Sequence, residues 1–205
     1  HSSREALRLW FALLEARNRR WHGVSRHDRW AILGGQMVAR AGRTRPPYWV
    51  RNPALLQLYL SSHNLSASTT GDYARMLRRF APTHVVAYPS AAAHLARVGL
   101  DAGWNAHRPR VFIANAEPVT ECQREVIEAY FGCPVRETYG MAEMVAAASE
   151  CEAGTLHFMS DAGVVEALDP ADRPVPSGEV GRLVFTGLVN QTMPLVRYDI
   201  GDRGR

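Results

Sequence analysis

Residues 137–144, which read ETYGMAEM, bring together an aromatic ring, a glycine and a carboxylate directly after a short β-branched run. The three residues are Tyr139, Gly140 and Glu143. This order is typical of a strand that ends at a nucleotide site, but it also fits a strand that simply leads into a helix. Because the stretch alone leaves both interpretations open, the surrounding sequence must decide between them.

Two further short loops carry polar residues where strands are expected to end, at residues 88–90 (YPS) and 115–118 (NAEP). In parallel α/β sheets, ligands bind at the carboxyl ends of the strands, where loops and helix N-termini present unpaired N–H groups. Each loop also has a purely structural interpretation, as a serine cap, a proline turn or a glycine that relieves backbone strain. Their joint order, together with PLVRYDIGD at 194–202, favours a ligand site.

The composition excludes several kinds of chemistry. All 24 residues counted as lysine or arginine are arginine, so no side chain can supply an ammonium group. A P-loop lysine, a Schiff base and a catalytic lysine are therefore excluded for this chain. The net charge of +4 is spread along the sequence and forms no basic run, so we expect no nucleic-acid partner.

Three cysteines, Cys122, Cys133 and Cys151, are an odd number without paired spacing, which argues against a disulfide framework. The hydrophobic fraction of 46% indicates a globular protein, and no apolar run is long enough to span a membrane. The charged first segment does not fit a signal peptide. We expect a soluble, cytoplasmic protein that has no membrane partner.

The elements that must position these loops alternate between helices and strands. Residues 2–21 show apolar residues at helical spacing and a capping-box pattern of Ser2 with Glu5, which predicts an amphipathic helix. Residues 29–35 (RWAILGG) predict a buried strand closed by two glycines. Residues 43–53 predict a proline-punctuated loop or extended segment.

The middle of the chain repeats a helix and a strand at roughly 25 residues per unit, the length of a parallel βαβ crossover. Ser90 can cap the second helix, and Thr120 with Gln123 forms a capping-box pattern for the third. The predicted helices are 69–82, 91–103 and 121–132, and the predicted strands are 83–89, 110–115 and 134–140. The fold class is therefore α/β, with a mainly parallel sheet flanked by helices.

After about residue 150 the pattern changes to short alternating runs that leave no room for crossover helices. The predicted strands here are 155–159, 163–168, 181–188 and 193–198. We therefore expect two domains. They are an α/β subdomain at 1–150 that carries the ligand-binding strand ends, and a small antiparallel β subdomain at 151–205.

The ordered set of motifs resembles the adenylate-forming superfamily of acyl- and aryl-CoA synthetases. It is most similar to the phenylacetate–CoA ligase family, including the capsular-polysaccharide relatives. NAEP, YGMAE and RYDIGD stand in the family's order, and further matching stretches run over nearly the whole chain. The resemblance implies part of the large domain of the adenylate-forming fold. For the full-length enzyme it implies an AMP-forming acid–thiol ligase.

By this resemblance, residues 115–118 lie along an adenine and Tyr139 stacks on the purine, which is worth roughly 1 to 3 kcal/mol if base stacking on aromatics is a guide. Gly140 lets the main chain approach the nucleotide. Glu143 is implied as the catalytic carboxylate and Mg²⁺ ligand. Asp202 is implied to accept hydrogen bonds from both ribose hydroxyls.

The implied site residues fall into three groups. The nucleotide-binding residues are Asn115, Ala116, Glu117, Pro118, Thr138, Tyr139, Gly140, Met141, Ala142 and Asp202. The acyl-pocket residues are Tyr88, Pro89 and Ser90, with Tyr59 and Ser61 as further candidates that fit a structural core equally well. Because some relatives hold zinc in this region, Cys151 and His157 are candidate Zn²⁺ ligands, with a buried thiol and a surface imidazole as the alternative.

Two features bear on catalysis. Ala142 stands where the family usually places a threonine or serine hydroxyl near the α-phosphate. Because alanine cannot donate a hydrogen bond, we expect binding of that phosphate to be weaker or supplied by other groups. By the resemblance, the phosphate loop and the C-terminal lysine domain are absent from this chain. We therefore expect these 205 residues alone to bind AMP weakly and to adenylate slowly or not at all.

The implied partners are a small carboxylic acid, ATP or AMP with Mg²⁺, and coenzyme A or another nucleophile as the acceptor. Zn²⁺ and a homodimer are left open. A second hypothesis is a non-catalytic nucleotide-binding or scaffolding relative, which Ala142 supports. A nicotinamide-dependent Rossmann enzyme also fits the α/β pattern, but no G-x-G-x-x-G follows a strand.

Overall fold

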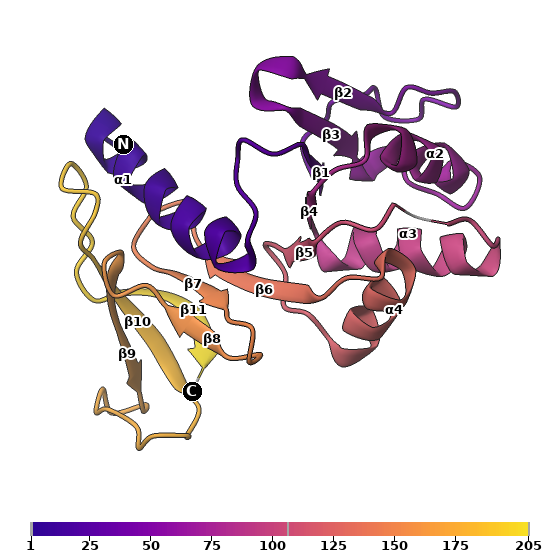
Figure 1. Ribbon diagram of the computed structural model, residues 1–205. Helices are drawn as coiled ribbons and strands as arrows, with labels where there is room; N and C mark the ends of the chain where they lie inside the picture. Colours follow the sequence, from indigo (N-terminus) through magenta and orange to yellow (C-terminus); the bar gives the residue numbers. More distant parts are fainter. Residues whose placement is uncertain (1, 106, 205) are drawn as a thin grey trace. The chain divides into compact units, whose positions relative to one another are not determined.

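The computed structural model describes residues 2–105 and 107–204, which form two compact units (Figure 1). The first, called the α/β unit, is Asn18–Thr138. The second, called the β unit, contains the residues up to Arg17 and those from Tyr139 onward. The division therefore lies before the expected boundary near residue 150, and the first helix is grouped with the C-terminal strands.

The described part of the α/β unit contains strands in the order β2-β3-β1-β4-β5-β6. Neighbouring strands from β3 to β6 are parallel, whereas β2 pairs antiparallel with β3. The strands are β1 (Trp30–Gly34), β2 (Trp49–Asn52), β3 (Gln57–Ser61), β4 (His84–Ala87), β5 (Val111–Ala114) and β6 (Val135–Gly140). Because the parallel strands point the same way, the loops after β1, β3, β4 and β5 leave from one edge of the sheet.

The helices α2 (Thr70–Phe80), α3 (Pro89–Asp101) and α4 (Glu121–Phe131) lie together on one side of these strands, as Figure 1 shows. The capping box of α4 is confirmed: Thr120 Oγ1 accepts the Gln123 N–H at 3.3 Å, and Gln123 Oε1 accepts the Thr120 N–H at 3.0 Å. The cap predicted for α3 is wrong, because Tyr88 is the N-cap residue and Ser90 lies inside the first turn.

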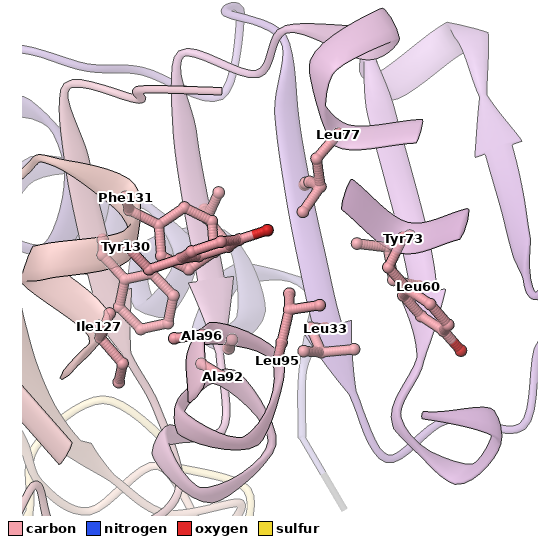
Figure 2. Close-up of a cluster of buried hydrophobic side chains, with 14 of the residues drawn as sticks. Leu33, Leu60, Tyr73, Leu77, Ala92, Leu95, Ala96, Ile127, Tyr130 and Phe131 are labelled. Atoms are coloured by element: carbon pink, nitrogen blue, oxygen red, sulfur yellow. The ribbon is translucent and has the colours of Figure 1, made fainter. Parts of the chain in front are cut away.

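The main core of the α/β unit lies between the sheet and these helices (Figure 2). Strands contribute Leu33 and Leu60, and helices contribute Leu77, Leu95 and Ile127, all at most 2% exposed. The opposite face of the sheet has a smaller cluster of Val24, Val111 and Ile113, against which Val86 packs. Both faces are covered, which is the usual state of a parallel sheet.

The described residues of the β unit form one α-helix and two small sets of antiparallel strands. The elements are α1 (Arg4–Leu14), β7 (Ala147–Glu150), β8 (Leu156–Phe158), β9 (Gly163–Leu168), β10 (Gly181–Gly187) and β11 (Tyr198–Gly204). Strand β7 pairs with β8, and β10 lies between β9 and β11. The expected fold class is therefore confirmed, although the strand expected at 193–198 begins only at Tyr198.

Helix α1 differs in detail from its prediction. Ser3 is the N-cap residue instead of Ser2, and its Oγ accepts the Ala6 N–H at 3.0 Å. Ala6 and Trp10 are buried in a cluster with residues of β7 and the following loops, whereas Phe11 is 62% exposed despite its helical spacing. The helix therefore buries a narrower stripe than expected. None of the described helices is long and apolar enough to cross a membrane.

Candidate functional site

The loops after β4 and β5 are joined by a carboxylate. Both the backbone N–H and the hydroxyl of Ser90 donate to Glu117, each at 2.9 Å, one to each carboxylate oxygen. Glu117 thus supplies a negative charge and two acceptors at the N-terminus of α3, where N–H groups are otherwise unsatisfied. A predicted acyl-pocket residue and a predicted nucleotide-binding residue are therefore in direct contact.

Hydrogen bonds link the NAEP loop and the end of β5 to the strands on either side, β4 and β6. The Asn115 N–H donates to the Ala87 carbonyl at 3.0 Å, and the next residue, Ala116, has a positive φ of 66°. Thr138 Oγ1 donates to the Ala114 carbonyl at 2.7 Å, and Thr138 is 7% exposed. The Thr138 hydroxyl proton is therefore used within the protein, while Asn115, Ala116 and Pro118 are exposed.

Two tyrosines of the predicted acyl pocket lie against the glycines that end β1. A Cβ built on Gly34 would come within 2.7 Å of the Tyr59 hydroxyl, and one on Gly35 within 3.1 Å of the Tyr88 ring. Each tyrosine therefore packs closely against a glycine, where a larger residue would crowd it. Pro89 is buried, and Tyr88 is half-buried.

The segment after β3 holds this glycine pair from the other side. Ser62 Oγ donates to the Gly34 carbonyl at 2.9 Å, and His63 Nε2 lies 2.8 Å from the Gly35 carbonyl. Ser61 is fully buried, and its hydroxyl donates to Asn64 Oδ1 at 2.9 Å. The Ser61 side chain is thus used internally, whereas His63 is an exposed residue at this edge that sequence reasoning missed.

The stretch ETYGMAEM does not lead into a helix. After β6 the chain makes a turn in which the Met144 N–H donates to the Met141 carbonyl at 3.2 Å, and β7 follows. Gly140 and Ala142 are exposed in this turn, and Met141 packs partly against the core of the β unit. The strand-into-helix interpretation is therefore wrong.

Tyr139 is held at both ends of its side chain. Its ring stacks near Phe185 at a centroid distance of 6.0 Å and meets Phe158 edge-on at 5.7 Å. Its hydroxyl donates to Asp202 Oδ2 at 2.6 Å. Burial, followed by the hydrogen bond and charge of Asp202, raises the pKa of Tyr139 above its ordinary value, so the phenol remains a neutral donor at physiological pH.

Glu143 has a different environment. In the part of the chain that the structure describes, its one polar contact is a long one, from the Tyr198 hydroxyl to Oε1 at 3.4 Å. Tyr198 pairs with Phe185 across β10 and β11, and Phe185 is the residue against which Tyr139 stacks. Tyr139 and Tyr198 both pack against the cluster that contains Phe185. Through these two tyrosines, Glu143 and Asp202 belong to one set of contacting side chains. Sequence reasoning found these three but missed Phe158, Phe185 and Tyr198.

An irregularity in the pairing of β10 with β11 sets the position of Asp202. The register shifts between Arg182 and Val184, which pair with Arg203 and Asp199 respectively, so β11 carries extra residues at this point. Gly201 lies there with a φ of +87°, which favours glycine. Bulges of this kind redirect side chains and are common beside functional sites.

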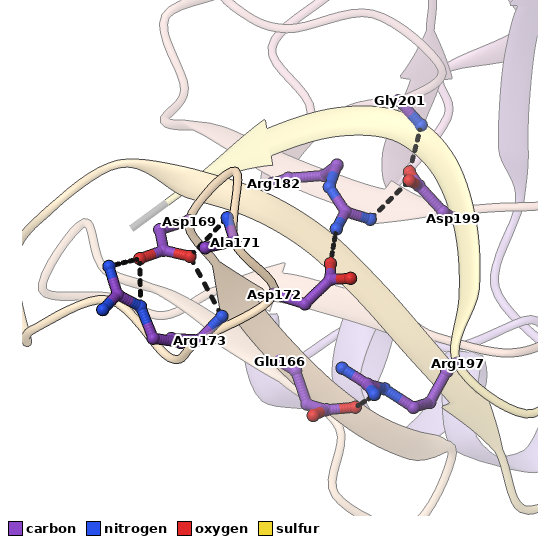
Figure 3. Close-up of polar contacts among 9 residues, drawn as sticks. All are labelled: Glu166, Asp169, Ala171, Asp172, Arg173, Arg182, Arg197, Asp199 and Gly201. Carbon is purple, nitrogen blue, oxygen red and sulfur yellow. Dashed lines mark hydrogen bonds and ion pairs between the residues drawn. The ribbon is translucent and has the colours of Figure 1, made fainter.

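Asp199 braces this bulge (Figure 3). Its Oδ1 accepts the Gly201 N–H at 2.8 Å, and its Oδ2 accepts from Arg182 at 2.5 Å. The Gly201 N–H, and after it the Arg182 guanidinium, hold the pKa of Asp199 below its ordinary value. Arg182 also pairs with Asp172, so its charge is shared between two carboxylates.

Cys151 and His157 lie together, with His157 Nε2 3.3 Å from Cys151 Sγ. Across residues 2–105 and 107–204, no group of three or more histidine, cysteine or acidic side chains could hold a metal ion. A structural zinc site needs four ligands, so these two residues alone do not fit zinc.

The chain is similar to known proteins that bind AMP. A family model described as "AMP-binding enzyme" matches residues 56–194. The chain is 29% identical over 182 residues to Protein CapK of Staphylococcus aureus, covering 88% of this chain and 39% of that protein. It is 32% identical over 145 residues to Phenylacetate-coenzyme A ligase of Thermus thermophilus, covering 67% of this chain and 33% of that protein. The chain thus spans well under half of these curated relatives.

Among solved structures, 2-hydroxyisobutyryl-CoA ligase in complex with 2-HIB-AMP and CoA shares the fold. The TM-score is 0.69 at 21% identity, over 95% of this chain and 46% of that one. The family match at residues 56–194 covers more than half of the chain and includes both the NAEP and the YGMAE motifs. The chain therefore belongs to the family of AMP-binding enzymes.

Proposed function

We propose that this chain carries the nucleotide-binding region of an ATP-dependent ligase that activates a carboxylic acid. In the first step, a carboxylate oxygen of the acid attacks the α-phosphorus of ATP, and pyrophosphate leaves. In the second, the thiol of coenzyme A, or another nucleophile, attacks the acyl carbon, and AMP leaves with the bonding electrons. The observation that carries the proposal is the connection of Tyr139, Glu143 and Asp202 within the β unit.

Each of these side chains has a role that its surroundings support. The Tyr139 ring is kept in a fixed plane by Phe158 and Phe185, which prepares a stacking surface for a purine. Asp202 is half-buried and has a second carboxylate oxygen, Oδ1, that the Tyr139 hydroxyl does not use. That oxygen can accept from ribose hydroxyls.

In the α/β unit, we assign the exposed residues of the NAEP loop to the nucleotide, and Tyr88, Pro89 and Ser90 to the acid. The support is their position at the carboxyl ends of parallel strands. Tyr59 lies at the same edge, against Gly34. The contact between Ser90 and Glu117 would make the two loops respond together.

Glu143 fits a role as a Mg²⁺ ligand. Mg²⁺ is usually held by one or two carboxylates together with substrate phosphates, so a single glutamate with a weakly engaged carboxylate is sufficient on the protein side. A bound Mg²⁺ would neutralise charge on the phosphates of ATP. No comparable case exists for zinc, since Cys151 and His157 have no third ligand in the described part of the chain.

This chain has few groups that could neutralise charge at the α-phosphate of ATP. Ala142 has no hydroxyl to donate, and the sequence has no lysine. We therefore expect these 205 residues to bind AMP weakly, and to catalyse little or no acid-dependent exchange of pyrophosphate into ATP. The same features favour the alternative of a non-catalytic nucleotide-binding or scaffolding relative.

Titration calorimetry with AMP separates a nucleotide-binding region from a scaffold, and exchange of pyrophosphate into ATP separates a ligase from a non-catalytic nucleotide-binding relative. A ligase region should bind AMP in the wild type and lose most of that binding in Asp202→Ala. A scaffold should show no AMP binding in either protein. A panel of carboxylic acids in a sensitive ATP–pyrophosphate exchange assay then tests which acid, if any, is activated. Strong exchange by the 205 residues alone would refute the expected weakness at the α-phosphate.

A further inference from the structure

The Tyr139 side chain carries a hydroxyl that purine stacking does not require. A phenylalanine would offer the same ring to a base, because stacking depends on the π-face alone. Yet the Tyr139 hydroxyl makes a hydrogen bond of 2.6 Å to Asp202, a residue 63 positions later in the chain. The hydroxyl must therefore have a role other than stacking.

We propose that the Tyr139 hydroxyl is a positioning group that fixes the Asp202 carboxylate and thereby sets the preference of the site for ribonucleotides. By donating to Oδ2, it leaves Oδ1 oriented for the ribose hydroxyls. One side chain would then couple recognition of the base to recognition of the sugar. This inference rests on the proposed nucleotide site, and it concerns which atoms make that site selective.

The strength of the contact supports this role. A separation of 2.6 Å is in the range of charge-assisted O–H···O⁻ bonds, which are about twice as strong as neutral ones. The raised pKa of Tyr139 keeps its proton in place, so the phenol acts as donor and the carboxylate as acceptor. The orientation of Asp202 is thus tied to the position of the Tyr139 oxygen.

That oxygen is itself well fixed. Phe185 is fully buried, and Tyr139 packs against the cluster that contains it. Phe158 meets the ring at an interplanar angle of 81°, so the ring is held on more than one side. A ring held by these contacts can therefore act as a reference point for the Asp202 carboxylate.

Asp202 needs such a reference. It follows Gly201 in the irregular part of β11, where regular strand pairing does not determine the direction of the side chain. Asp199 holds the backbone of the bulge through Gly201, but it makes no bond to the Asp202 carboxylate among the described contacts. The bulge thus places Asp202, and the Tyr139 hydroxyl orients it.

The test is a double-mutant cycle on the full 205-residue chain with Tyr139→Phe, Asp202→Ala and the double variant. Affinities are measured by calorimetry for AMP and for 2′,3′-dideoxy-AMP, which lacks both ribose hydroxyls. We expect Tyr139→Phe to weaken AMP binding about three- to tenfold, the effect of losing part of a charge-assisted hydrogen bond. It should leave 2′,3′-dideoxy-AMP unchanged. In the Asp202→Ala background, the same substitution should change neither affinity.

Tyr130→Phe is the matched control. It removes the same atom from a buried tyrosine on α4, whose hydroxyl has no hydrogen-bond partner in the residues that the structure describes. Its affinities should equal those of the wild type. Circular dichroism of every variant establishes that the fold is retained.

The outcomes separate this inference from the proposed function. Equal loss of both ligands in Tyr139→Phe would mean that the ring has moved, and unchanged AMP binding would mean that the hydroxyl has no role; either result overturns the inference. A wild type that binds AMP and 2′,3′-dideoxy-AMP equally well overturns it too, while the purine site survives. A wild type that binds no AMP overturns the inference and the proposed function together.

Discussion

Replacing Glu117 by alanine should destabilise the α/β unit through the N-terminus of α3. The substitution removes the acceptor of two hydrogen bonds, from the Ser90 N–H and from the Ser90 hydroxyl, and the negative charge that faces the helix dipole. Loss of a helix N-cap costs about 0.5 to 2 kcal/mol. Because Glu117 is half-buried and Ser90 is exposed, water replaces part of the loss, and we expect a decrease of about 1 kcal/mol in the free energy of unfolding.

Urea unfolding followed by far-ultraviolet circular dichroism measures this change. Glu117→Gln keeps an acceptor oxygen but removes the charge, so it should lose less stability than Glu117→Ala. Ser90→Ala removes only the hydroxyl donor and should also lose less. Combining Ser90→Ala with Glu117→Ala should add little to the effect of Glu117→Ala alone, since both act on one contact.

Glu125→Ala is the control, because Glu125 is an exposed glutamate on α4 with no polar contact among the described residues. It should leave the free energy of unfolding within about 0.5 kcal/mol of the wild type. The reasoning is refuted if Glu117→Ala is as harmless as this control, or if the effects of Ser90→Ala and Glu117→Ala are fully additive.

Two further predictions concern other parts of the chain. Burial, and after it Arg19, lowers the pKa of His84 to about 4, so the unfolded chain binds a proton more readily than the folded one between about pH 6.5 and pH 4. The contribution of neutral His84 to the free energy of unfolding is therefore complete above pH 6.5 and is lost as the pH falls toward 4. Urea unfolding of the wild type should show a loss of about 2 to 3 kcal/mol between pH 7 and pH 4.5. The loss should be smaller in His84→Gln. Asp199→Ala should loosen the bulge at Gly201, and in calorimetry it should weaken the binding of AMP more than the binding of 2′,3′-dideoxy-AMP. An equal fold-change in the affinities for the two ligands would contradict this. Asp161→Ala, an exposed position in the β unit, is its control.

Local signals in the sequence predicted the helices well where all partners lie within a few residues. The capping box of Thr120 and Gln123 is such a case, since both hydrogen bonds close over three positions. Ser90 shows where such local prediction fails. The serine looked like a cap, but the acceptor for the helix comes from Glu117, 27 residues away, which no local pattern specifies.

Strands were harder to predict because their pairing is non-local. Strand β7, with the sequence AASE, has weak intrinsic β-propensity and becomes a strand through its pairing with β8. Strand β3 (QLYLS) lies between β2 and β1, and these two partners come from segments before it in the chain that the strand's own residues do not specify. At 193–198 the apolar run predicted a strand, yet pairing with β10 in this region uses residues from Tyr198 onward.

The candidate site shows the same division. Residue types in ETYGMAEM and RYDIGD indicated an aromatic face and two carboxylates, and the structure gathers these in the β unit. The contact of Tyr139 with Asp202 was not predictable, because it depends on a bulge centred on a glycine with positive φ. Phe158 and Phe185 were missed because strand residues of this type are usually explained by a core.

The candidate site is better equipped for the base and sugar of a nucleotide than for its phosphate. Groups suited to a purine and a ribose are present, and they are held by one another and by a braced bulge. Groups suited to the α-phosphate are sparse, since Ala142 offers no hydroxyl and no lysine exists in the sequence. Binding energy from base and sugar does not depend on phosphate charge, whereas adenylation depends on neutralising it. Nucleotide binding and catalysis should therefore separate in this chain. In calorimetry, AMP and adenosine should therefore bind with similar affinity, because the phosphate group that only AMP carries adds little to its binding.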